Sequence, residues 1–104
     1  MIWNFNYDKA IRQAEQIDSV AGDMTALANN TMGGAISAVN ASWDGTSSDL
    51  FLRHCEDTRG QILEKARQLT QAAVKIRNVA RILHEAEMNA RRQMEELSRR
   101  ATGG

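Results

Sequence analysis

The sequence contains no proline, a single cysteine and few aromatic residues, and its formal charges cancel. Thirteen Lys and Arg residues balance thirteen Asp and Glu residues over 104 positions. Neutrality argues against a dedicated binder of nucleic acid. One cysteine excludes a disulfide framework within the chain and a multi-cysteine metal site. No apolar run approaches the roughly 18 residues needed to span a membrane, so we expect no stable membrane insertion.

The N-terminal residues 1–8 lack the basic n-region and the apolar h-region of a secretory signal peptide. We therefore expect that any export takes a route independent of a signal peptide. The chain is 42% hydrophobic and 25% charged, which is typical of a folded soluble protein. Its length allows one domain, so residues 1–104 are predicted to form a single domain.

Residues that break helices gather at only one place in the middle of the chain, between Asn40 and Asp49. Gly, Asn, Asp and Ser side chains offer the backbone alternatives to a helix, so this cluster predicts a turn. The fold class is therefore all-α, a helix-turn-helix hairpin of two long antiparallel helices. The predicted segments are helix one over about 7–41, the turn over 42–46, helix two over about 46–97 and a flexible tail over 98–104.

Both helix starts have recognisable caps. Asn6 is predicted as the N-cap of the first helix, and Asp8 suits the positive end of its dipole. Thr46 and Asp49 have the spacing of a capping box for the second helix.

Apolar residues recur at alternating intervals of four and three, which is the pattern of a coiled-coil seam. In the first helix the predicted seam is Ala10, Ala14, Ile17, Ala21, Met24, Ala28, Thr31, Ala35 and Ala38. A second row lies beside it, formed by Ile11, Val20, Leu27, Met32, Ile36 and Val39. In the second helix the predicted seam is Phe51, Cys55, Thr58, Ile62, Lys65, Leu69, Ala72, Ile76, Val79, Leu83, Ala86, Ala90, Gln93 and Leu97.

The two predicted helices differ in length, about 50 Å against about 78 Å at roughly 1.5 Å per residue. An antiparallel fold then leaves residues 83–97 projecting beyond the start of helix one. Residues 1–45 carry two basic and five acidic side chains, a net charge of −3, which leaves +3 on residues 46–104. This asymmetry favours pairing of the two helices.

A lone hairpin cannot bury both of its apolar rows, and a second hairpin would complete a four-helix bundle. We therefore predict a dimer, and whether the partner is identical stays open. The packing residues expected in the hairpin or the dimer are Ile17, Met24, Leu27, Ile62, Leu69, Ile76 and Leu83.

The turn contains Trp43-Asp44-Gly45, a W-x-G tripeptide between two long amphipathic helices near mid-chain. In this setting the chain, from about residue 7 to 97, resembles the WXG family of small bacterial type VII (ESX) secretion substrates, the early-secreted-antigen-like proteins. The physical interpretation stands beside the resemblance. Trp43 is expected to pack over the end of the bundle, and Gly45 to adopt a positive φ angle in the reversal.

The family also carries a C-terminal secretion pattern, hydrophobic-x-x-x-acid-x-x-hydrophobic-x-x-x-hydrophobic. Leu83, Glu87, Ala90 and Met94 match its spacing, whereas the Tyr that many members carry is replaced by Leu83. This pattern falls on the segment that is expected to project from the hairpin.

The resemblance implies a protein made in the bacterial cytoplasm and secreted as a folded homodimer or heterodimer with another WXG-type protein. It further implies recognition by the type VII secretion ATPase and a role as effector, partner or targeting factor for a larger toxin, in virulence or interbacterial competition. The alternative is a cytosolic helical adaptor or chaperone that binds another helical protein and is not exported.

We predict no enzymatic activity, no cofactor and no metal, because the titratable residues form no convergent set. His54 and His84 lack the Glu three positions earlier that a di-metal helical bundle uses. Cys55 lies on the predicted seam, which favours a small buried side chain over a nucleophile.

Overall fold

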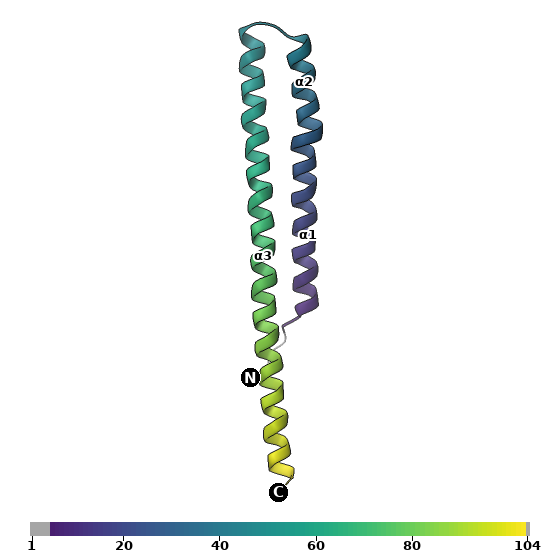
Figure 1. Cartoon of the computed structure of the whole chain (residues 1–104), viewed down its shortest axis with the longest axis vertical. Coiled ribbons are helices and arrows are strands. Elements are labelled where there is room, and N and C mark those ends of the chain that lie inside the picture. Colours follow the sequence, from purple (N-terminus) through teal and green to yellow (C-terminus); the bar gives the residue numbers. More distant parts are fainter. Residues whose placement is uncertain (1–4, 104) are drawn as a thin grey trace.

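The computed structural model describes residues 5–103 as two antiparallel helical rods joined by one short turn (Figure 1). The first rod consists of α1 (Tyr7–Ala26), a π-helical segment η1 (Leu27–Met32) and α2 (Gly33–Ser42), which follow one another directly. The second rod is the single helix α3 (Thr46–Thr102). Within the described residues there is no strand, so the predicted all-α hairpin is confirmed.

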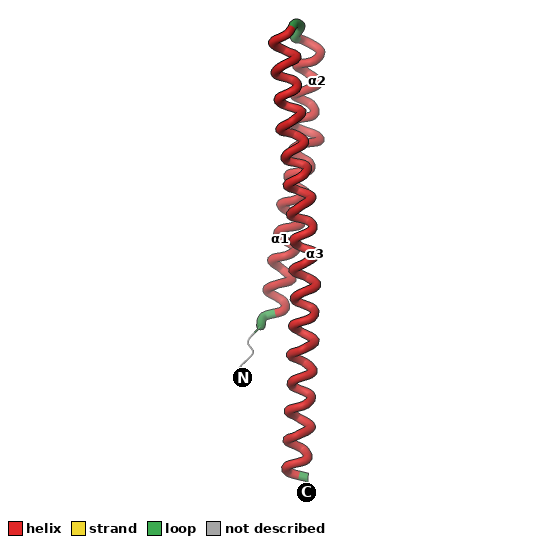
Figure 2. Tube along the Cα trace, turned by 90° about the vertical axis from the view of Figure 1, so that its left-hand side faces the viewer, coloured by secondary structure: helices red, strands yellow, loops and turns green. Residues whose placement is uncertain are grey.

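The hairpin is long and thin, with extents of 89 × 15 × 14 Å and a radius of gyration of 24.5 Å. A compact domain of this length would have a radius of gyration of about 13 Å. Figure 2 shows the same two rods side by side in the perpendicular view. Two helices packed in a single layer therefore account for the whole described fold.

The first rod begins as the sequence predicts. The Asn6 side chain accepts a hydrogen bond from the backbone N–H of Lys9 at 2.9 Å, which caps the first turn of α1. Asp8 lies in that first turn, where its negative charge favours the positive end of the helix dipole.

The turn is built on Gly45, whose φ angle of +102° is a conformation that side chains with a Cβ rarely adopt. Gly45 is also the N-cap of α3, so the prediction of Thr46 as the cap was wrong by one residue. The Ser48 hydroxyl donates to the Gly45 carbonyl at 2.9 Å, and Ser48 is buried. A glycine N-cap provides no side-chain acceptor for the first N–H groups of α3. Glycine fits this position because the chain reversal requires a positive φ angle.

We expect Gly45→Ala to lower the free energy of unfolding by about 1–3 kcal/mol, because the added Cβ forces strain at a positive φ angle. Gly60→Ala is the matched control, since a Cβ at this helical position of α3 meets nothing within 4 Å. That control should gain about 0.5–1 kcal/mol of stability through helix propensity. Thermal melts followed by circular dichroism measure both changes, and equal effects would contradict the role of Gly45.

The buried apolar core consists of alanines spaced seven residues apart in both rods. They are Ala14, Ala21 and Ala28 in the first rod and Ala66, Ala73 and Ala80 in α3. Small side chains at every second turn let two helix backbones approach closely. No large side chain of the described residues is fully buried. The core is therefore close-packed but narrow.

An ion pair between Asp18 and Arg77 joins α1 to α3, as the opposite net charges of the two halves predict. Both side chains are about one-third exposed, at 36% each. A partly exposed pair contributes modestly to stability, so its main effect is to orient the two rods.

The phase of the first seam changes within η1. Up to Ala28 the predicted seam faces α3, but Thr31, Ala35 and Ala38 are exposed, which corrects that part of the prediction. The positions toward α3 are taken by Met32, Ile36 and Val39, members of the second predicted row. The π-helical segment contains one more residue per turn than an α-helix, so it shifts the later residues by one position.

The predicted α3 seam also differs from the structure: at every second position, the buried residue is the one that follows the predicted residue. Lys65 and Val79 were predicted on the seam but are exposed, whereas their neighbours Ala66 and Ala80 are buried. The smaller residue of each adjacent pair faces the other rod because it allows the closer approach. The predicted packing residues Ile62, Leu69, Ile76 and Leu83 are half-buried beside these alanines.

The C-terminal end of α3 differs from the prediction as well. Residues 98–102, predicted as a flexible tail, continue the helix to Thr102. Glu96 pairs with Arg99 and Arg100 along this last turn, and the Thr102 hydroxyl donates to the Ser98 carbonyl. Because neither Gly nor Pro occurs between Leu97 and Gly103, nothing ends the helix earlier.

Candidate interaction surfaces

The C-terminal part of α3 projects beyond the first rod, as its length predicts (Figure 1). The Tyr7 ring stacks on the His84 ring with centroids 4.6 Å apart, so the start of α1 lies level with His84. Residues 85–102, here called the projecting segment, extend about 27 Å further at 1.5 Å per residue. This segment is a single helix with no described residue of the first rod beside it in either view (Figure 2).

The predicted secretion residues all lie along one face of α3 where it leaves the hairpin. Leu83 is half-buried against the end of the first rod, and Ala90 and Met94 are exposed. The Glu87 side chain is only 11% exposed and pairs with Arg91 at 3.1 Å. Intervals of three and four place these residues in line with the seam of the hairpin. The structure therefore places the four residues along one face of α3, of which Ala90 and Met94 are exposed.

The turn carries an exposed aromatic pair. Trp43 ends α2 and is 54% exposed, and its ring packs against the ring of Phe51 with centroids 5.6 Å apart. Leu50, which the sequence analysis did not single out, is 58% exposed beside them in the chain. Trp43 thus packs on the second turn of α3, and Trp43, Leu50 and Phe51 leave an apolar surface at the tip.

One long side of the hairpin carries several exposed apolar side chains. Asp18 and Val20 lie on opposite sides of the α1 seam, because two residues correspond to about 200° of helix rotation. Arg77 and Val79 are related in the same way on α3. Since Asp18 pairs with Arg77 on one side, Val20 and Val79 share the other.

This side, here called the apolar flank, consists of Val20, Leu27, Ala72, Val79 and Ile82. All but Ala72 are large hydrophobic residues that are between 46% and 57% exposed. Leu27, predicted as a packing residue, is therefore outside the contact between the two rods. Toward the start of α1 the flank continues into an apolar groove of about 280 Å³, lined by Phe5, Ala10, Lys75, Ile76, Val79 and Ala80.

The remaining packing residues named from the sequence, Ile17 and Met24, are half-buried toward α3. Val20 and Leu27 were predicted in a second row of the first helix, but nothing in the sequence joins them to Val79 and Ile82. The Asp18–Arg77 pair is the observation that joins them, and no sequence pattern identifies that pair in advance.

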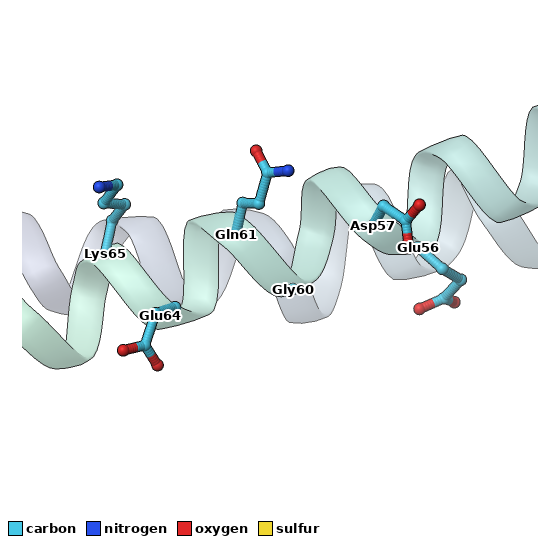
Figure 3. A pocket seen from close by; sticks show the side chains of 6 residues that line it. All are labelled: Glu56, Asp57, Gly60, Gln61, Glu64 and Lys65. Carbon is cyan, nitrogen blue, oxygen red and sulfur yellow. The ribbon is translucent and has the colours of Figure 1, made fainter.

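A polar depression of about 690 Å³ lies on the outer face of α3 and holds Glu56, Asp57, Gly60, Gln61, Glu64 and Lys65. In Figure 3, Gln61 and Lys65 project from one edge of a single helix, and Glu56 and Glu64 project from the other edge. The adjacent Arg67 donates hydrogen bonds to Glu64, which lowers the pKa of that carboxyl. Side chains that diverge on one exposed helix do not form a converging catalytic set.

Cys55 is half-buried, as its seam position predicts, and His54 is exposed. Among residues 5–103, no three side chains of His, Cys, Asp or Glu gather where they would hold a metal ion. In the same part of the chain, no helix combines the length and the apolar character that crossing a bilayer requires.

Comparison with known proteins adds no assignment. The chain matches no protein-family model, no curated protein and no solved structure. Support for a function therefore comes from the surfaces of the hairpin itself.

Proposed function

We propose that this protein is a small non-enzymatic binding protein, exported as a folded dimer by a bacterial type VII secretion system. In this role it acts as an effector, a partner or a targeting factor for a larger secreted toxin. The supporting observation is the projecting segment, which carries Glu87, Ala90 and Met94 beyond the start of α1, with Leu83 just before it. Ala90 and Met94 are exposed on this helix, so this part of the pattern is accessible to a secretion ATPase while the rest of the chain stays folded.

The proposed dimer rests on the surface that one hairpin leaves exposed. The chain exposes 7901 Å², whereas a compact protein of the same mass exposes about 5,800 Å². The difference, about 2,000 Å² for one chain, exceeds the roughly 800 Å² that each partner buries in a standard protein interface. We assign the interface to the apolar flank because the other side carries the Asp18–Arg77 ion pair. The second hairpin is another copy of this chain or another WXG-type protein.

Export is tested by Glu87→Ala, expressed in the native bacterium with its type VII apparatus intact. We expect loss of the protein from the culture medium while the helix content of the purified variant is unchanged. The reason is that Glu87 is the acidic member of the pattern, and Ala is a strong helix former. Immunoblots of cell and medium fractions measure the partition.

Glu85→Ala is the matched control, because Glu85 is an exposed acid on the same helix outside the pattern. It should be exported like the unchanged chain. Deleting the secretion ATPase should retain all variants in the cell. Equal export of both Glu variants would contradict the signal assignment. Retention of the unchanged chain whether or not the ATPase is present would instead favour the cytosolic adaptor.

A further inference from the structure

The π-helical segment η1 sets which residues of the first rod face α3. In the first rod, the buried and half-buried positions toward α3 run Ala21, Met24 and Ala28, and then continue at Met32 and Ile36. Two successive intervals of four therefore follow Ala28, where a regular seam would alternate four with three. One residue more than the α-helical period is accommodated within Leu27–Met32.

A side chain from the opposite rod holds this segment. The Arg59 Nε–H group donates to the Ala28 carbonyl at 2.9 Å, and its terminal NH2 group donates to Asn29 Oδ1 at 2.8 Å. Ala28 has no exposed surface, and Arg59 is only 29% exposed. Within the rod, the N–H of Gly33 donates to the Asn30 carbonyl, three residues back instead of four. A cationic donor stabilises a carbonyl at such a break in the helical ladder.

We propose that Arg59 and η1 form a register lock, which selects one of two apolar rows of the first rod for contact with α3. With the extra residue in place, Met32, Ile36 and Val39 are directed toward α3. Without it, a continuous α-helix would direct Thr31, Ala35 and Ala38 there, because one residue rotates a helix by about 100°. The three larger side chains would then lie on the outside. The lock therefore determines which apolar surface the hairpin presents, whether or not the protein is secreted.

Deletion of Asn30 tests the lock directly. Removing one residue from η1 changes the interval from Ala28 to Met32 from four to three, which restores a regular α-helical seam with the same side chains facing α3. We expect a melting temperature within about 3 °C of the unchanged chain. Deletion of Ser19, an exposed residue within regular α1, is the matched control. It rotates residues 7–18 out of the seam and should lower the melting temperature by about 15 °C or more.

Arg59→Met completes the test because it keeps an unbranched stem and removes the donors. In the unchanged chain we expect a decrease of about 5 °C, since the Ala28 carbonyl loses the Arg59 donor. In the Asn30 deletion, where no π turn needs a donor, the same substitution should have little effect. The proposal is overturned if the two deletions are equally harmful, or if Arg59→Met costs the same in both backgrounds.

Discussion

Ala73→Leu should destabilise the hairpin more than any other single conservative substitution in α3. Ala73 has no exposed surface and lies in the middle of the three buried alanines of that helix. A leucine there must enter a contact in which the two rods already touch, so either the rods separate or the side chain leaves its preferred rotamer. We expect a loss of about 3 kcal/mol, and a decrease in melting temperature of about 15 °C.

The control for this substitution is Ala86→Leu, an exposed alanine thirteen residues further along the same helix. Alanine and leucine have similar helix propensities, so a difference between the two variants reports packing alone. Ala86→Leu should change the free energy of unfolding by no more than about 0.5 kcal/mol. Thermal melts of both variants at one protein concentration provide the comparison. If Ala73→Leu melts like its control, the rods are not held together at the alanines.

The hairpin, the start of the first helix and the turn could be predicted because each depends on local chemistry. Asn6 caps the first helix through its own side chain, and Gly45 takes a positive φ angle that few other residues allow. The start at Tyr7 and the turn after Ser42 match the prediction to within one residue. These features require knowledge of only a few neighbouring residues.

The phase of the seams could not be read from hydrophobicity alone. Ala72 and Ala73 are adjacent and chemically identical, yet only Ala73 is fully buried. The choice depends on how closely two backbones approach, which is a property of both helices together. A strict seven-residue spacing of alanines in both halves was the available signal. It identifies the buried row because two helices of alanine pack at the shortest distance.

The one-residue shift of the seam at η1 was even harder to predict from the sequence. Asn29, Asn30 and Thr31 gave no sign that the helix would widen, and the predicted seam passed through Thr31. The larger side chains of Met32 and Ile36 gain more by facing α3 than Thr31 and Ala35 would, and this gain outweighs the cost of one irregular turn. Arg59 stabilises the result from α3, thirty residues away. Such a contact is not visible in any local pattern.

The position of the candidate secretion pattern, in contrast, could be predicted from the sequence. Leu83, Glu87, Ala90 and Met94 were chosen by their spacing, and the position of the last three beyond the first rod followed from the unequal lengths of the two helices. The stack of Tyr7 on His84 agrees with that estimate. Length and rise per residue were sufficient here because both rods are continuous.

Val79→Glu should convert the proposed dimer into monomers. Val79 is 55% exposed on the apolar flank, and a second hairpin packed there would enclose it. An uncompensated charge in such an interface costs about 3 kcal/mol or more, which weakens association by at least about a hundredfold. Glutamate is a better helix former than valine, so the separated hairpin should keep its helix content. Sedimentation velocity over a micromolar concentration series measures the change in oligomeric state.

Val74→Glu is a close control for this variant. Val74 is 48% exposed on the same helix, but it lies about 60° from Arg77, on the side of the ion pair. It should remain a dimer with the affinity of the unchanged chain. Equal weakening by both substitutions would place the interface elsewhere.

The behaviour of the unchanged chain tests the identity of the partner. If it aggregates or melts without cooperativity, the partner is an obligate one of different sequence, because the apolar flank of the isolated chain would then be exposed to water. A stable monomer at high concentration would contradict the dimer, since about 2,000 Å² of additional surface would then stay in water at no visible cost.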